Sequence, residues 1–237
     1  TNEYYNKYGS TEDGGHMSHD EHVYHQLANR PWAALYVAAF FFFMISLGTL
    51  AFYAIQRAAQ SGWSPVLFRV MEGITAYLLP GGLALLLILL LSTLHLNHLF
   101  IWMDPEVVEY DKIIKAKSGY LEPYFFLVRG VIYLSGWYLY RYFSRKFSHL
   151  QDRSNDNKYH IKNFKLSAAF LVFFLVTESM MSWDWIMSID PHWFSTLFGW
   201  YVFASMAVSG ITTIALISIY LKSKGYLPNV NAVSYTH

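Results

Sequence analysis

The fold of this chain is decided by residues 166–193, LSAAFLVFFLVTESMMSWDWIMSIDPHW. Residues 166–176 are apolar enough to lie in a bilayer, and they lead directly into Glu178, Asp184 and His192. A carboxylate at membrane depth is costly unless it is paired, protonated or next to water. The stretch therefore predicts a membrane helix that carries a proton or ligand site toward one end.

Composition predicts an all-α, polytopic membrane protein. Hydrophobic residues make up 54% of the chain and charged residues only 14%, and the mean hydropathy is +0.24. Several apolar stretches are each about 20 residues long, the length that crosses a bilayer as a helix. The net charge of +1 gives no indication of a nucleic-acid partner.

Cysteine is absent from the sequence. Iron–sulfur clusters and Cys-x-x-Cys-His haem attachment both need cysteine thiols. We therefore expect neither an iron–sulfur cluster nor a covalently attached haem in this chain. A metal centre with which it works would lie on a histidine and carboxylate site or on another subunit.

The apolar runs predict five membrane helices. They cover residues 32–55, 70–94, 123–143, 166–187 and 194–221. The chain as a whole is then expected to divide into three parts. These are an external, His-rich acidic segment (1–30), a transmembrane bundle (31–226) and a cytoplasmic tail or linker to further helices (227–237).

Two prolines predict local features of these helices. Pro31 is expected in the first turn of its helix, where the missing N–H costs nothing. Pro80, followed by Gly81 and Gly82, is expected to kink the second helix and to free backbone carbonyls for water or a neighbour.

The distribution of the 17 lysine and arginine residues predicts the orientation. Most of them would lie on one side, in the loop 144–165 and at the ends of neighbouring helices. Cytoplasmic loops carry an excess of these residues, so the N-terminal segment is predicted to be outside and the C-terminal one inside. Glu72 then lies near the cytoplasmic face, whereas Arg129, Glu178 and Asp184 lie toward the outer face.

Charged side chains within these helices are candidates for proton transfer. They are Glu178, Glu72, Asp184 and Arg129. Glu72 and Glu178 are predicted to be opposite ends of a proton route, with water admitted at the Pro80 kink. Arg129 could clamp an anion or pair with Glu178, which would lower the cost of burying both. Asp184 could instead cap a helix end.

A second group of outer residues is a candidate binding site for a quinone head group. Its members are His95, His98, Arg129, Trp183 and His192. On a helix, His95 and His98 would share one face and could hold a metal or bond a head group. The alternative is a pair of interfacial histidines bonded to loops. A bis-histidine haem is disfavoured because no histidine is expected on the opposite side of such a ring.

The N-terminal segment contains His16, His19, His22 and His25 at a spacing of three. On an α-helix that spacing rotates each step by about 60°, so all four cannot converge on one ion. Acidic residues lie among them. The segment is therefore predicted to be a solvated lead-in to the first helix, and weak metal binding by adjacent pairs of histidines is the alternative.

Four stretches of the sequence resemble a known family. They are WSPVLFRVMEGITAY (63–77), HLNHLFIW (95–102), residues 177–201 and YLKSKGY (220–226). Together they resemble the ActF-type membrane subunit of bacterial alternative complex III, which is related to the NrfD/PsrC-like quinone-interacting subunits. The resemblance covers nearly all of residues 30–226.

The resemblance implies part of a bundle of about ten helices in the bacterial cytoplasmic membrane. That complex oxidises menaquinol or ubiquinol and passes electrons through iron–sulfur and c-type haem subunits to a cytochrome oxidase. This subunit would carry no redox metal, and a sister NrfD-like subunit would be the better candidate for the productive quinol site. The function then expected is quinone contact, proton conduction or both. A structural scaffold and a stand-alone proton-coupled transporter are the alternatives.

Overall fold

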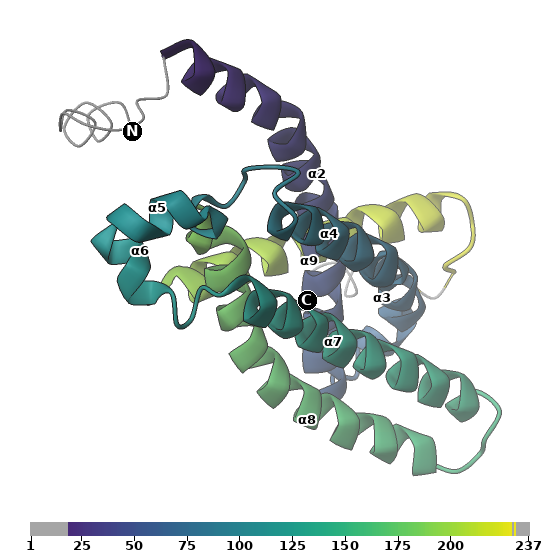
Figure 1. The fold of residues 1–237 in the computed structure, drawn as a ribbon. Helices are drawn as coiled ribbons and strands as arrows, with labels where there is room; N and C mark the ends of the chain where they lie inside the picture. The colour runs from purple at the N-terminus through teal and green to yellow at the C-terminus, as the bar shows by residue number, and fades with distance from the viewer. Residues whose placement is uncertain (1–18, 229, 231–237) are drawn as a thin grey trace.

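Every regular element in the described residues, 19–228 and 230, is a helix in this computed structural model (Figure 1). The long helices are α2 (His19–Ala58), α4 (Leu78–Thr93), α7 (Pro123–Gln151), α8 (Lys158–Met181) and α9 (Phe198–Ser223). The short ones are α3 (Phe68–Ile74), α5 (Pro105–Tyr110) and α6 (Lys112–Lys117). This confirms the predicted all-α class.

The bundle is organised around α2 and the antiparallel pair of α7 and α8 (Figure 1). Helix α2 packs against α4, α8 and α9, while α7 packs against α4 and α8. Aromatic side chains fill the centre. The ring centroid of Phe43 in α2 lies 6.1 Å from that of Trp137 and 6.0 Å from that of Trp185. Each of these three side chains is fully buried, so they join the three helices into one core.

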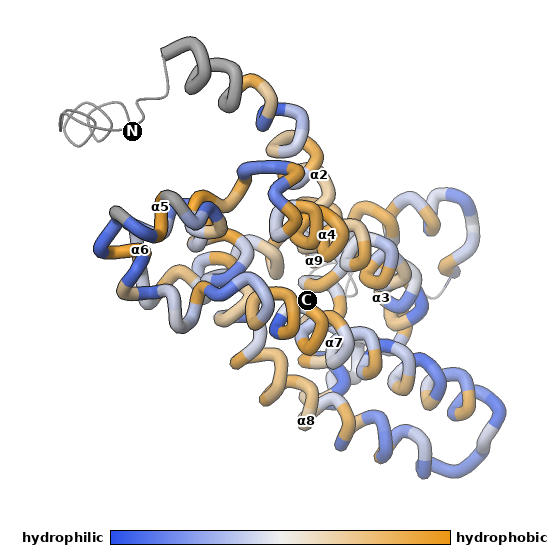
Figure 2. Tube along the Cα trace, in the orientation of Figure 1, coloured by the Kyte–Doolittle hydropathy of each residue, from blue (hydrophilic) through white to orange (hydrophobic). Residues whose placement is uncertain are grey.

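Four helical segments of the described chain are long and apolar enough to cross a membrane. They are Leu27–Ala58, Ser64–Thr93, Lys158–Ile189 and Phe198–Ser223. The chain is therefore a multi-pass membrane protein by length and composition. Helix α7, the fifth predicted span, is not among these four, because Arg129 and Arg141 limit its apolar run to residues 130–140. Its 29 residues are long enough to accompany α8 across a bilayer, and it runs antiparallel to that helix (Figure 1). Figure 2 shows the hydrophilic half of α7 beside the hydrophilic start of α8.

Helix α2 begins earlier than the sequence predicted. It starts at His19 rather than near Trp32, so Pro31 lies inside the helix and not in its first turn. A proline there removes one backbone hydrogen bond, to the carbonyl of Leu27. His16 lies outside the described residues, and so do the side chains of His19, His22 and His25.

The helix of the second membrane segment is interrupted near Pro80, as predicted, but the interruption lies a few residues before Pro80 and not at Gly81 or Gly82. A 3₁₀ turn, Thr75–Tyr77, separates α3 from α4. Pro80 is the third residue of α4, where an N–H has no partner inside the helix. Gly82 serves packing, because a Cβ added there would lie 2.3 Å from Cδ1 of Leu134. The glycine thus lets α4 approach α7 closely.

Small residues also set the contact between α2 and α9. A Cβ at Gly48 would lie 2.2 Å from the carbonyl oxygen of Met206, and one at Gly210 would lie 2.8 Å from the backbone nitrogen of Thr49. Membrane helices use glycine at such contacts because it lets two backbones touch. The α2–α9 crossing therefore depends on these two positions.

The orientation of the bundle gives a testable expectation. Charge predicts that residues after α9 face the cytoplasm and that α6 faces outward. A reporter fused after Lys224 should be active only in its cytoplasmic form, and one inserted beside Lys115 only in its external form. The opposite pattern in both fusions would reverse the assigned sides of the membrane.

Candidate functional site

One end of the α7–α8 pair contains a buried ion pair between Arg129 and Asp184. The guanidinium donates to both carboxylate oxygens, with Nε 2.8 Å from Oδ2 and Nη2 3.0 Å from Oδ1. Tyr133 donates its hydroxyl to the same Oδ2 at 3.0 Å. Asp184 is 0% exposed, and a bidentate partner with a further hydrogen bond makes such burial tolerable. Arg129 therefore pairs with Asp184 and not, as one alternative had it, with Glu178.

Tyr120 covers the more exposed side of this ion pair. Its ring centroid lies 4.1 Å from the guanidinium carbon of Arg129, and its carbonyl accepts from Nη1 at 3.1 Å. Partial burial and the nearby Asp184 carboxylate raise the pKa of the Tyr120 hydroxyl. The phenol therefore stays neutral and acts as a hydrogen-bonding and stacking group.

A π-helical turn, Ser182–Ile186, places Asp184 in this position. The turn continues directly from α8, and such turns are frequent at functional sites. Side chains satisfy its backbone: Tyr36 of α2 donates to the Trp185 carbonyl at 2.6 Å, and Ser188 donates to the Asp184 carbonyl. Asp184 thus forms an ion pair from within the helix and does not cap its end.

Polar side chains continue from this pair along the contact of α7 with α8. Nε1 of Trp137 donates to Oγ1 of Thr177 at 3.0 Å. The hydroxyl of Tyr140 lies 2.8 Å from Oγ of Ser167. All four side chains are buried. Trp137 and Tyr140 are three residues apart, so they lie on the same face of α7, and this face contacts α8.

A third hydrogen-bonded pair of side chains joins α7 to α8 nearer the loop between these helices. Ser144 donates to Oδ1 of Asn163 at 2.5 Å, and Nδ2 of Asn163 donates back to the Ser144 carbonyl at 3.1 Å. The same hydroxyl of Ser144 lies 3.4 Å from the hydroxyl of Tyr53 on α2. We call this row of polar groups, all buried except the half-buried Arg129, the polar seam. Its members are Arg129, Tyr133, Trp137, Tyr140, Ser144, Asn163, Ser167, Thr177 and Asp184.

Glu72 lies at the far end of the seam, within a cluster of charges. Its Oε1 accepts from the Tyr53 hydroxyl at 3.1 Å, and its Oε2 lies 2.6 Å from Nη1 of Arg69. Arg57 stands 4.0 Å from the same carboxylate and donates to the hydroxyls of Tyr53 and Ser148, each at 3.1 Å. Glu72 is buried, so two guanidinium groups compensate its charge.

Glu178 lies beside the seam, next to Thr177 in sequence, and is 2% exposed. Among the described residues no group donates to its Oε1, and Oε2 lies 3.5 Å from Oγ of Ser179, the longest distance a hydrogen bond tolerates. An uncompensated carboxylate in a membrane helix is costly, and a proton on the carboxyl group removes that charge. Glu178 is thus chemically suited to carry a proton.

Trp183 and His192, two of the residues predicted to contact quinone, differ in their surroundings. Nε1 of Trp183 is buried and has no acceptor among the described residues, so it could donate to a quinone carbonyl. Nε2 of His192 lies 2.6 Å from Oδ2 of Asp111, which also caps α6 by accepting from two backbone N–H groups. The Trp183 indole N–H and Oε1 of Glu178 are thus two buried polar groups without a partner among the described residues.

His95 and His98 do not lie on one helix face as predicted. Helix α4 ends at Thr93, His95 has a positive φ of 57°, and both side chains are exposed. The backbone of His98 exchanges two hydrogen bonds with the side chain of Asn29. Asn97 between them is the buried residue, and its Oδ1 accepts from Ser92 at 2.6 Å. The pair therefore belongs to an interfacial loop.

Several residues of the site were missed by the sequence analysis. They are Tyr53, Tyr133, Trp137, Tyr140, Ser144, Asn163, Ser167 and Asp111. A signal was present for those on α7, where polar and aromatic residues recur every three or four positions on one face. No sequence signal pointed to Tyr53, because its partners Glu72 and Ser144 lie on other helices.

Comparison with known proteins gives no assignment. No protein-family model matches the chain, and no curated protein matches it. Among the side chains that the structure describes, which do not include those of residues 19–26, no group of three or more histidine or acidic residues could hold a metal ion. The site is therefore interpreted from its own geometry.

Proposed function

We propose that this chain is an integral membrane subunit of a bacterial quinol-oxidising complex and that it conducts protons along the polar seam. The observation that carries this proposal is the row of buried polar groups between the Arg129–Asp184 pair and Glu72. A bilayer helix bundle gains little from burying so many polar groups unless they bind or transfer something. The partners would be those of the resembling family: a sister NrfD-like subunit, iron–sulfur and c-type haem subunits, and a cytochrome oxidase.

The seam offers hydroxyl and carboxyl groups at successive levels. Tyr133 and Tyr140 lie about 10 Å apart along α7 at 1.5 Å per residue. Trp137 stands between them, and its indole N–H donates but cannot accept. A proton therefore needs another carrier at that level. Glu178 follows Thr177, which Trp137 contacts, and its carboxyl group would be that carrier.

Quinone contact is the second part of the proposal. A quinol bound here would release two protons and two electrons, and the electrons would pass to the iron–sulfur subunit of the complex. In this chain the Trp183 indole would orient the head group, and Glu178 would accept a hydroxyl proton. The buried, unpartnered Nε1 of Trp183 and Oε1 of Glu178 support this role.

A structural scaffold is the competing function. It is favoured by the pairing within the seam, where the hydroxyls of Tyr140 and Ser144 already have partners on α8. Such hydrogen bonds also hold membrane helices together. A stand-alone transporter is the other alternative, and it is motivated by the helix break before Pro80.

The test is proton transfer by the complex reconstituted in liposomes, with Glu72→Gln, Glu178→Gln and the double variant. Glutamine keeps the shape of each side chain and removes the proton. Each single variant should slow proton transfer severalfold, and the double should be no slower than the slower single, because both block one path. Glu109→Gln, at an exposed position, should change nothing.

Two results would argue against the route. Additive losses in the double variant would indicate two separate structural roles for Glu72 and Glu178. Unchanged proton transfer in both single variants, with the complex assembled, would favour the scaffold.

A further inference from the structure

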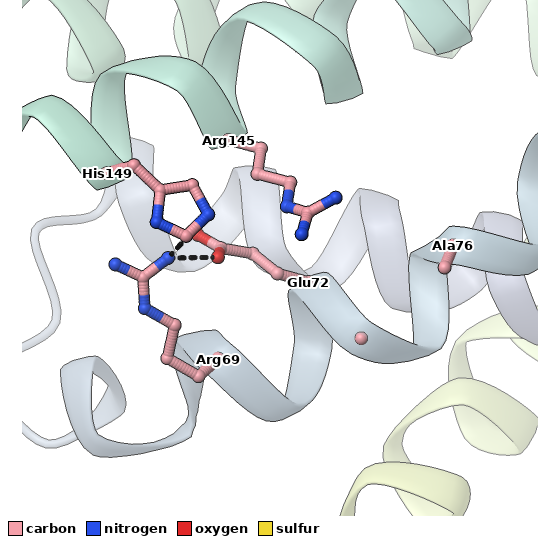
Figure 3. Close-up of a pocket in the computed structure, with 6 residues that line it drawn as sticks. Arg69, Glu72, Ala76, Arg145 and His149 are labelled. Atoms are coloured by element: carbon pink, nitrogen blue, oxygen red, sulfur yellow. Dashed lines mark hydrogen bonds and ion pairs between the residues drawn. The ribbon is translucent and has the colours of Figure 1, made fainter.

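A hollow of about 150 Å³ opens between α3 and α7, beside the carboxylate of Glu72 (Figure 3). One water molecule occupies about 30 Å³ in the liquid, so the hollow has room for a group of several heavy atoms. The residues that line it are Arg69, Glu72, Gly73, Ala76, Arg145 and His149.

Positive charge exceeds negative charge around this hollow. Arg57 and Arg69 both face Glu72, and Arg69 also pairs with Asp152. The two positive charges of these guanidinium groups equal the two negative charges of the carboxylates. Arg145 adds another guanidinium to the lining, and no described residue forms a hydrogen bond or ion pair with it. An anion in the hollow would compensate that charge.

The side chains converge from two helices. In Figure 3, Arg145 and His149 reach down from α7, while Arg69 and Glu72 rise from α3. His149 follows Arg145 by four residues, so both lie on one face of α7. Its Nε2 is 3.4 Å from Nη1 of Arg69, which brings the basic groups of the two helices together.

We propose that this hollow binds a phosphate group between the guanidinium groups of Arg145 and Arg69. Planar guanidinium groups bind phosphate oxygens through paired N–H donors. The hollow lies at the end of the bundle that the charge distribution assigns to the cytoplasm, where basic pockets between membrane helices bind lipid head groups. The phosphate could come from an anionic phospholipid or from solution. This inference does not rest on the proposed proton route.

The experiment measures the unfolding temperature of the purified full chain in detergent micelles at constant ionic strength. It is titrated separately with short-chain phosphatidylglycerol, short-chain phosphatidylcholine and inorganic phosphate. Arg145→Gln removes the unpaired guanidinium. Lys146→Gln is the matched control, because Lys146 is the exposed neighbour on α7 and does not line the hollow.

A rise in unfolding temperature with phosphatidylglycerol alone would identify a lipid head group, and a rise with inorganic phosphate as well would identify a phosphate site open to solution. In either case Arg145→Gln should raise the apparent dissociation constant about tenfold, the loss expected for one charged hydrogen-bonding partner. Lys146→Gln should leave it unchanged. No rise with either ligand, or equal rises in native chain and Arg145→Gln, would overturn the proposal.

A second variant keeps the test valid if Arg145→Gln does not fold. A Cβ added at Gly73 would contact nothing within 4 Å, so Gly73→Leu should fold and fill the hollow without a change of charge. Leucine is also a better helix former than glycine. Loss of the phosphate-dependent rise in Gly73→Leu supports the site, whereas native-like binding by that variant contradicts it.

Discussion

Replacing Arg129 by methionine is expected to destabilise the chain by about 3–5 kcal/mol, the cost of leaving one partner of a buried ion pair uncompensated. Asp184 is 0% exposed, and Arg129 contacts both of its oxygens. Tyr133 alone would then remain on the carboxylate. The measurement is equilibrium unfolding of the purified chain in mixed micelles.

The double variant Arg129→Met/Asp184→Leu provides the internal comparison. Because both charges are gone, its stability should recover most of the loss of the single variant. Arg153→Met, in the exposed turn after α7, is the control for loss of an arginine as such. A single variant as stable as the Arg153 control would show that the Arg129–Asp184 pair contributes little.

The second large effect is expected for Gly48→Ala. The added Cβ would lie 2.2 Å from the backbone carbonyl oxygen of Met206, and a backbone atom cannot turn aside as a flexible side chain can. Helices α2 and α9 would have to separate. Overpacking of this kind costs about 1–3 kcal/mol or more, which should appear as a lower unfolding temperature.

Gly73→Ala is the matched control for this substitution. It also lies in a helix, α3, but a Cβ there would meet nothing within 4 Å. Alanine in a helix is favoured over glycine by about 1 kcal/mol, so this variant should be slightly more stable. Equal destabilisation by both variants would mean that the α2–α9 contact is not the cause.

The helical class was predictable from apolar length, because a bilayer crossing needs a long apolar run wherever it occurs. Residues 166–176 are such a run and lie in α8 as expected. Helix α7 was harder to predict. Its apolar residues alternate with Tyr133, Trp137, Tyr140 and Ser144, whose spacing of three or four makes one face polar and lowers the mean hydropathy of the helix.

The partners of the site residues were not predictable from the same patterns. Arg129 could reach either Glu178 or Asp184, which lie six residues apart near the same helix end. The choice depends on the π turn Ser182–Ile186 and on the register of α7 against α8. A sequence pattern that assumes 3.6 residues per turn does not reveal a π turn, because a π turn locally has more residues per turn.

The contact of Glu72 with Tyr53 shows the same limit for residues on different helices. Glu72 was predicted near one face of the membrane, and it lies at the end of the seam nearest the α7–α8 loop. In place of the predicted link to Glu178 through the Pro80 kink, we propose a path along α7 and α8. Which helices pair is a property of packing, and apolar patterns alone do not encode it.

The central claim, that protons move along the polar seam, is tested most directly by Tyr140→Phe. This change removes one hydroxyl, the one 2.8 Å from Oγ of Ser167, and leaves the ring stacked on Phe170 at 3.9 Å. Tyr142→Phe, on the exposed face of the same helix, is the matched control. We predict that Tyr140→Phe lowers proton transfer per quinol oxidised by the reconstituted complex, while Tyr142→Phe does not. Equal proton transfer by both variants and the native complex would contradict the claim.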